Sequence, residues 1–454
     1  MSTSPMNTSP MNTLTNDLRL SWALLRGSDR REWWRIGLTA LGAGLATGLG
    51  QFAAALWSLR GYHEVPYAAG LFNSPGERRG IVFALVLLLV PVLAFLGQCA
   101  RIGAVHRDRR LAGLRLAGAG AGQVRRIAAL ETGPACLVGA GVASAVSVAV
   151  LASQWKGASL FTWAGVAAVA LMVPVVGAGA GLLALRHVVA SPLGWVRRVR
   201  PQVGRGAWAV VAGSVAGVLA LTFMVFVLSV GLVLVPVLML MLVVVVGIGA
   251  VGIAGALARL AGRVLAPRAR SAAVLIAAER LRDDPWAAAR THAAVLLVTV
   301  VGTGYVSVRA VLVDALSRGR HAESDAFYLA GLDLTAAAIG LGLLIALSGL
   351  AVGAAESLAS RRRGLAAQVA AGVPRTVLAR ALLLETALPL APAVLFAGGG
   401  GAVLGAWYGA LADVPVPWST PLVPLAVYGA CLLAAATSLP LLGRAVRPGE
   451  LRQA

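Results

Sequence analysis

The chain has 454 residues, of which 59% are apolar and only 13% are charged. Soluble globular proteins carry about 25% charged residues, and disordered chains lack apolar residues, so this composition excludes both classes. The formal net charge is +21, which leaves a membrane surface, nucleic acid or an acidic protein as candidate partners.

Ten stretches are long and apolar enough to cross a membrane as helices, since a span needs about 20 mostly apolar residues. In chain order they are residues 36–59, 80–100, 133–151, 161–185, 207–230, 233–257, 293–313, 331–355, 382–408 and 421–443. Residues 15–35 mix apolar and charged positions, which predicts an interfacial helix before the first span. The apolar run over 207–257 is too long for one crossing, so we interpret it as two spans that turn near residues 231–233. The predicted fold is therefore an all-α integral membrane protein of about ten helices.

The distribution of cations predicts the orientation of these spans. With the N-terminus inside, 32 of the 39 cations fall in inner segments and seven in outer ones, and the single lysine, Lys156, is among the outer seven. Cytoplasmic loops carry such an excess of Lys and Arg, so both termini are predicted to be cytoplasmic. This rule accounts for the positive net charge of the chain. Nucleic-acid binding is disfavoured, because it needs a basic face with interleaved aromatic residues on a soluble domain, and the sequence shows none.

Two of the inner loops repeat each other. Residues 107–132 and 361–386 align at a constant offset of 254 without a gap, and ten of the 26 positions are identical. The identical pairs are Arg107/Arg361, Arg109/Arg363, Leu111/Leu365, Ala112/Ala366, Ala117/Ala371, Gly118/Gly372, Arg126/Arg380, Leu130/Leu384, Glu131/Glu385 and Thr132/Thr386. Two spans precede each loop and two follow it, which predicts two parallel four-helix units joined by a two-helix hairpin.

This 4+2+4 arrangement divides the chain into five segments. They are a cytoplasmic tail with the interfacial helix (1–35), a first four-helix unit (36–187), a two-helix connector with its flanking cytoplasmic segments (188–290), a second four-helix unit (291–443) and a cytoplasmic tail (444–454).

Each repeated loop is predicted to form a short helix, a break and a second helix that continues into the next span. Gly118 and Gly120 are predicted to break the first loop, and Gly372-Val373-Pro374 the second, where Pro374 also favours the start of the next helix. A rigid elbow of this kind would transmit a push from the cytoplasm into the membrane. The alternative is a basic loop that only anchors to anionic headgroups. Because the loop occurs twice, we favour the rigid elbow, as an element on which a cytoplasmic partner docks, over a simple membrane anchor.

Both loops resemble the inner loop of the FtsX-like permease family, the membrane subunits of ABC transporters of the macrolide-exporter and bacitracin-exporter kind. The matching stretches are Arg109 to Ala119 (RRLAGLRLAGA), followed by Leu130-Glu131, and Arg363 to Val373 (RGLAAQVAAGV), followed by Leu384-Glu385. The chain departs from the family pattern at Arg110 and Gly364, where the family has Glu. The outer loops 60–79 and 314–330 are also too short for the folded outer domain that the family usually carries.

The resemblance implies a bacterial plasma-membrane protein on which a separate cytoplasmic ABC ATPase docks, in two copies. ATP and Mg²⁺ would bind to that ATPase, and no cofactor is expected in this chain. The implied ATPase-docking residues are Arg107, Arg109, Leu111, Gly118, Arg126, Glu131, Arg361, Arg363, Leu365, Gly372, Arg380 and Glu385.

The sequence contains no pattern that predicts catalysis or metal binding. A P-loop needs a lysine, and Lys156 lies outside. The five histidines lie in separate loops, and Cys99, Cys136 and Cys431 lie in separate apolar stretches, so neither a zinc site nor a disulfide framework is expected. We therefore expect no enzymatic activity in this chain itself.

Two functions remain as hypotheses. In the first, the chain is the permease subunit that couples ATP hydrolysis to export or membrane extraction of an amphiphilic cargo, such as a peptide antibiotic, a lipid or a lipoprotein, as in antimicrobial peptide resistance. In the second, the same movement is mechanotransmission that controls a cell-wall hydrolase or a sensor kinase and moves no cargo. The short outer loops favour transport. A gradient-driven carrier is disfavoured, because charged residues are nearly missing from the middle of the spans.

Two glycine pairs, Gly44-xxx-Gly48 and Gly401-xxx-Gly405, have the spacing that lets membrane helices approach closely. In a chain with 54 glycines such pairs also arise by chance, so the sequence leaves both interpretations open.

Overall fold

The structure is a computed structural model of the whole chain. It describes residues 30–63, 68–101, 113, 116–155, 157–184, 206–227, 235–318, 325–412, 414–415 and 417–445. Within these ranges every regular element is a helix, and nine helices are long and apolar enough to cross a membrane. The prediction of an all-α, multi-pass membrane protein is therefore confirmed at this level.

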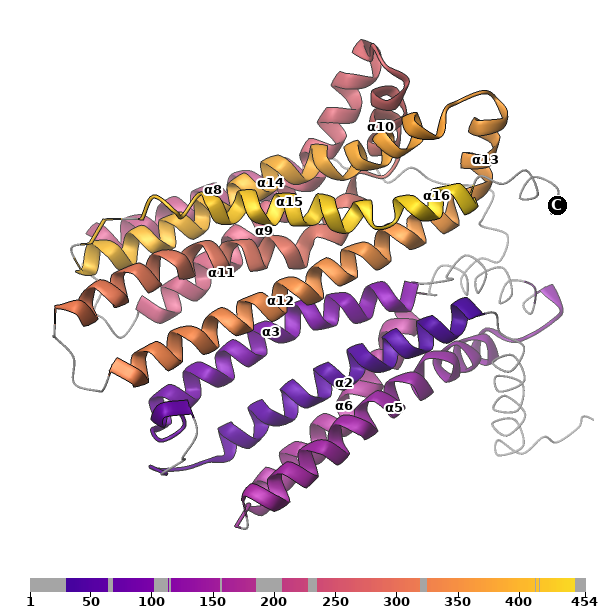
Figure 1. Cartoon of the computed structure of the whole chain (residues 1–454). Coiled ribbons are helices and arrows are strands. Elements are labelled where there is room, and N and C mark those ends of the chain that lie inside the picture. The colour runs from indigo at the N-terminus through magenta and orange to yellow at the C-terminus, as the bar shows by residue number, and fades with distance from the viewer. Residues whose placement is uncertain are drawn as a thin grey trace, which may run out of the picture. The chain divides into compact units, whose positions relative to one another are not determined.

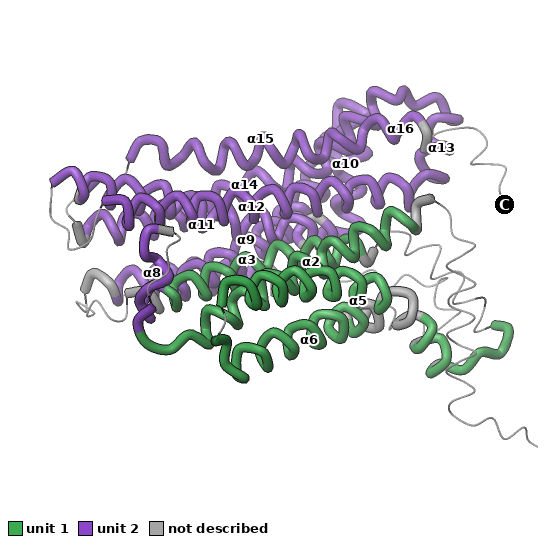
Figure 2. The backbone as a smooth tube through the Cα atoms, turned by 60° about the horizontal axis from the view of Figure 1, so that its bottom comes forward, with its two compact units in different colours: residues 1–61, 78–199 green, residues 62–77, 200–454 purple. Residues whose placement is uncertain are grey.

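The helices fall into two compact units, which Figure 2 shows in different colours. Unit 1 comprises residues 1–61 and 78–199, and unit 2 comprises residues 62–77 and 200–454. The helices of unit 1 are α2 (Arg30–Ser58), α3 (Pro75–Arg101, whose first turn belongs to unit 2), α5 (Ala121–Gln154) and α6 (Leu160–Ala184). Those of unit 2 are η1 (Ala68–Gly70), α8 (Gly206–Val227), α9 (Val235–Leu265), η3 (Ala266–Arg268), α10 (Ala272–Asp283), α11 (Pro285–Ser317), α12 (Asp325–Ser360), α13 (Arg362–Ala370), α14 (Arg375–Ala412), α15 (Leu422–Ala436) and α16 (Leu439–Ala445).

Each predicted span overlaps a helix, and the tenth overlaps two, α15 and α16, but several helices extend well past the predicted ends. Helix α12 has 36 residues and α14 has 38, so each is longer than the roughly 30 Å thickness of the hydrocarbon core at 1.5 Å per residue. In the fifth predicted span the described apolar part of α8, Trp208–Met224, is shorter than the other nine spans. The predicted turn at residues 231–233 lies outside the described residues, as does most of the predicted interfacial helix.

In unit 1, helix α2 lies along α5 and α6. The backbones of α2 and α5 pack tightly at Gly139 of α5, where an added Cβ would lie 1.9 Å from the carbonyl oxygen of Ala40. The buried Gln51 side chain also joins the three helices, because its Nε2 donates to Ser144 Oγ at 2.8 Å and to the Val166 carbonyl at 3.1 Å. Glycine contact and side-chain hydrogen bonds thus hold these helices together where the hydrophobic effect between helices is weak.

In unit 2, α11 lies along α14 and α9, and α8 lies along α9. An added Cβ at Gly401 would lie 2.5 Å from the Val300 carbonyl oxygen, and one at Gly405 would lie 2.3 Å from Ser307 Cβ. Both glycines of that pair are therefore packing positions. In the first pair, Gly44 contacts Gly139, but nothing lies within 4 Å of a Cβ built at Gly48.

Replacement of Gly139 by Ala should destabilise unit 1 by about 1–3 kcal/mol, because the methyl group overlaps the Ala40 carbonyl and forces α2 and α5 apart. Gly141 is the matched control, since it lies two residues further along α5 and a Cβ there has nothing within 4 Å. Thermal unfolding of the two purified variants in the same detergent measures the difference. Equal midpoints for Gly139→Ala and Gly141→Ala would contradict this account of the α2–α5 contact.

Candidate functional site: the elbow between α13 and α14

The second repeated loop forms the predicted helix, break and helix. Helix α13 ends in a Schellman motif, in which the amide of Gly372 donates to the Val369 carbonyl at 2.9 Å and that of Val373 donates to the Gln368 carbonyl at 3.0 Å. Gly372 has φ +91°, a left-handed conformation that glycine adopts without strain. Pro374 follows, and α14 begins at Arg375. Local chemistry at Gly372 and Pro374 thus places the break where the sequence predicts it.

The buried face of this elbow forms part of a leucine cluster. Leu358 of α12, Leu365 of α13, Leu378 of α14 and Leu442 of α16 are all at most 4% exposed. Ile276 of α10 packs against them. Figure 1 shows α10, α13 and α16 together at one end of unit 2. The elbow is therefore a packed structural element, in which α13 shares an apolar cluster with α10, α12, α14 and α16.

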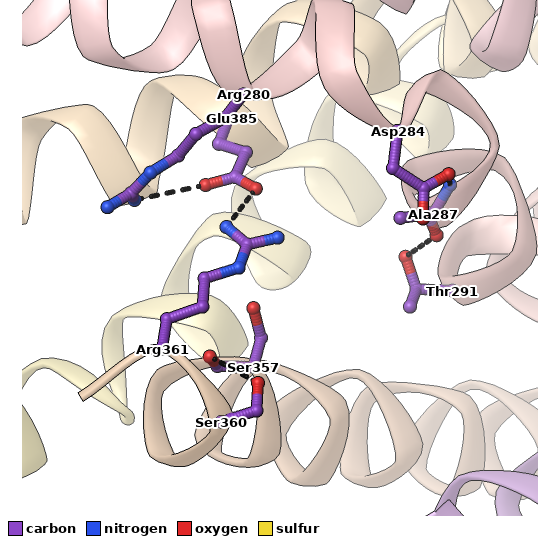
Figure 3. A network of polar contacts seen from close by, with 8 residues as sticks. All are labelled: Arg280, Asp284, Ala287, Thr291, Ser357, Ser360, Arg361 and Glu385. Atoms are coloured by element: carbon purple, nitrogen blue, oxygen red, sulfur yellow. Dashed lines mark hydrogen bonds and ion pairs between the residues drawn. The ribbon is translucent and has the colours of Figure 1, made fainter. Parts of the chain in front are cut away.

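A carboxylate next to the elbow holds two arginines from different elements (Figure 3). Glu385 Oε1 lies 2.7 Å from Nη1 of Arg361, the residue between α12 and α13, and Glu385 Oε2 lies 3.4 Å from Nη1 of Arg280 in α10. The exposed side-chain fractions are 20% for Glu385, 16% for Arg280 and 36% for Arg361. The cluster of Arg280, Arg361 and Glu385, here called the elbow latch, joins α10, the α12–α13 junction and α14.

Burial and charge act in opposite directions on Arg280. Burial lowers the pKa of its guanidinium, the negative charge of Glu385 raises it, and the neighbouring Arg361 lowers it. A guanidinium starts from so high a pKa that Arg280 stays charged at neutral pH. The latch therefore holds one negative and two positive charges. The attraction of Glu385 to both arginines offsets the repulsion between Arg280 and Arg361.

The first repeated loop has a left-handed glycine at the aligned position of its break. Gly118 has φ +98°, Gly120 precedes the first turn of the next helix, and α5 begins at Ala121, which is 254 residues before Arg375. Helices α5 and α14 thus start at aligned positions of the repeat.

The side chains of the two second helices also match where both are described. Val124 and Ile127 of α5 are buried, as are the aligned Leu378 and Ala381 of α14. Arg126 and its counterpart Arg380 are both exposed. Each second helix therefore buries one apolar face and exposes the repeated arginine.

The structure brings together some of the predicted docking residues and leaves others apart. Arg361 and Glu385 belong to the latch, Leu365 belongs to the leucine cluster, and Gly372 forms the break. Arg363 and Arg380 are exposed beside the elbow. In the first copy, Arg107, Arg109 and Leu111 lie outside the described residues, and of Glu131 only the backbone, within α5, is described.

Sequence reasoning missed Arg280. The residue counted only as one of many inner arginines, although α10 carries a helical pattern in which Ala273, Ala277, Ala278 and Leu281 are buried. That amphipathic pattern could have indicated a helix packed against the elbow. Within the part of the chain that the structure describes, no group of three or more His, Cys, Asp or Glu side chains could hold a metal ion.

No known protein family matches the chain, and no curated protein matches it.

Proposed function

We propose that the chain is the permease subunit of an ATP-driven ABC transporter in a bacterial plasma membrane. In this proposal two copies of a cytoplasmic ATPase, which carry ATP and Mg²⁺, dock on the two elbows. The cargo is amphiphilic and is exported or extracted from the membrane. The two repeated units, 36–187 and 291–443, flank the hairpin within 188–290, with both termini cytoplasmic.

One observation carries the proposal. The two breaks have the same left-handed glycine, Gly118 and Gly372, and the following helices begin at aligned positions. A loop that only anchored to headgroups would not need the same break and the same buried face twice. Two matching elbows suit a motor that engages the chain at two places.

The elbow in unit 2 has the mechanical properties that the proposed coupling needs. Helix α14 runs without a break from Arg375 to Ala412, with Pro389 and Pro392 inside it, so a displacement at its cytoplasmic start is carried along one continuous helix into the membrane. Glu385 connects this helix to α10, and α10 in turn packs on α9. In the proposed cycle, closure of the ATPases on ATP pushes the elbows, and the packed helices carry the movement to the spans.

A pull-down from the native host tests the proposal. The full chain is tagged, extracted in a mild detergent and analysed by mass spectrometry, with an unrelated tagged multi-pass protein of the same host as the control. We expect a stoichiometric partner that carries a P-loop and is missing from the control. If cross-linking before extraction also captures no such ATPase, the permease proposal is wrong, and a captured kinase or hydrolase would support the signalling hypothesis instead.

A further inference from the structure

An apolar cavity of about 430 Å³ lies in unit 2 between α8, α9 and α11. Its walls include Val210 of α8, Ile248 and Gly252 of α9, and Trp286, Ala293 and Leu297 of α11. The volume falls in the range of small-molecule binding cavities, about 300–1,000 Å³. Ile248 is 55% exposed, so the cavity opens to the surface of the unit.

Glycines on α9 let neighbouring side chains come close to its backbone beside this cavity. Gly247 and Gly252 line the cavity and contribute no side chain to fill it. A Cβ at Gly252 would lie 3.0 Å from Val210 Cγ1, and one at Gly255 would lie 3.1 Å from the Trp286 ring. Helix α8 and the Trp286 ring therefore pack close to the α9 backbone and leave the cavity between them.

The chemistry of the walls selects hydrocarbon as the occupant. Every lining residue is apolar, so water or a peptide backbone inside would lack hydrogen-bond partners. An acyl chain needs none. Apart from Trp286, which precedes the seventh predicted span, the residues that line the cavity belong to segments that are predicted to cross the membrane, where acyl chains are the solvent.

Two arginines continue the cavity face of α9 toward the predicted cytoplasmic end. Arg259 follows Gly252 by seven residues and Arg263 follows it by eleven, spacings that return to the same face of a helix. Side chains on a helix lean toward its N-terminus, which for these positions is the direction of the cavity. Neither arginine has an ion-pair partner among the described residues, in contrast to Arg280 in the elbow latch.

We propose that this cavity holds an acyl chain of an anionic phospholipid whose phosphate contacts Arg259 and Arg263. The inner leaflet carries anionic lipids, and basic pockets between membrane helices on the cytoplasmic side suit their headgroups. Trp286 lies in the first turn of α11, shortly before the span predicted to begin at residue 293, and tryptophan is common at such span ends. The proposal concerns unit 2 alone and holds whether or not an ATPase docks on the elbows.

Native mass spectrometry of the delipidated full chain tests the headgroup part. The probes are dioleoyl-phosphatidylglycerol and dioleoyl-phosphatidylcholine, which share acyl chains and differ in charge. We expect the wild type to bind the anionic lipid more tightly, and the double variant Arg259→Gln with Arg263→Gln to lose that preference by about tenfold. Arg268→Gln with Arg270→Gln is the matched control, because it removes the same charge from the same inner segment off the cavity face. Equal losses in both double variants would show non-specific charge attraction and would overturn the proposal.

A filled cavity tests the acyl-chain part. Ala293→Phe places a ring in the cavity and should reduce binding of both lipids, whereas Ala426→Phe on the exposed face of α15 should not. Ala293→Leu, a smaller filling, serves if the phenylalanine variant does not fold. Lipid binding by the folded filled variant at the wild-type level would overturn the proposal.

Discussion

Replacement of Glu385 by Ala should loosen the inner end of α14 and the whole of α13. The variant leaves Arg280 and Arg361 close together without the carboxylate that both contact, and Arg280 is only 16% exposed. Removal of the charged partner of a largely buried group costs about 1–3 kcal/mol. Hydrogen exchange measures the effect directly, and the amides of residues 362–382 should exchange about tenfold faster or more.

Two further variants test whether the effect comes from the latch. Glu279→Ala removes a carboxylate from α10 that pairs with Arg282 at 3.5 Å, but both of those side chains are about half exposed. Exposed pairs contribute little, so this variant should leave exchange in the elbow unchanged. Glu385→Gln keeps an oxygen that can accept one hydrogen bond and should show an intermediate effect. Wild-type exchange in Glu385→Ala would mean that the leucine cluster alone fixes the elbow.

The sequence predicts the local structure of the elbow well, because the break depends on residues that are neighbours in the chain. Gly372 supplies the left-handed conformation and Pro374 favours a new helix start, so the end of α13 and the start of α14 follow from a few consecutive residues. Apolar runs likewise predict the spans, since a membrane requires long apolar helices.

Span ends and tertiary pairs are less predictable from the sequence. The apolar pattern predicts the ninth span over 382–408, but α14 continues at both ends, because a helix does not have to stop where apolar residues stop. Arg280 and Glu385 are 105 residues apart, and nothing near either residue indicates the other. Gly139 shows the same limitation, since its role depends on Ala40 of another helix.

The elbow latch also differs from the site that the resemblance implies. Of the predicted docking residues, Arg361 and Glu385 pair with each other, so their side chains help to hold the elbow in shape. Arg363 and Arg380 are exposed beside it. Docking of a partner should therefore depend on the exposed arginines, and transmission of its movement should depend on the latch.

If the proposed ATPase docks on the elbows, reversal of charge at the aligned positions Arg109 and Arg363 should abolish its co-purification. Arg363 is exposed on α13, so its replacement by Glu leaves the leucine cluster and the latch in place. If acidic patches of the ATPase face these arginines, like charges then oppose each other at both elbows, and we expect the affinity to fall about hundredfold. Quantitative mass spectrometry of the pull-down, normalised to the tagged chain, measures the loss.

The matched control for this variant is Arg268→Glu with Arg270→Glu, which changes the net charge equally at η3 and the residues that follow it, away from the repeated loops. The control should retain the ATPase, because a general loss of positive charge weakens steering but removes no docking contact. Retention by both double variants would show that the elbows are not the docking surface, even if an ATPase is present. Loss in both would show that only the overall charge matters. Loss confined to Arg109→Glu with Arg363→Glu would assign docking to the elbows. Glu385→Ala in the same assay would then separate docking from coupling. This variant should keep the ATPase bound, but ATP hydrolysis by that ATPase should no longer respond to the permease.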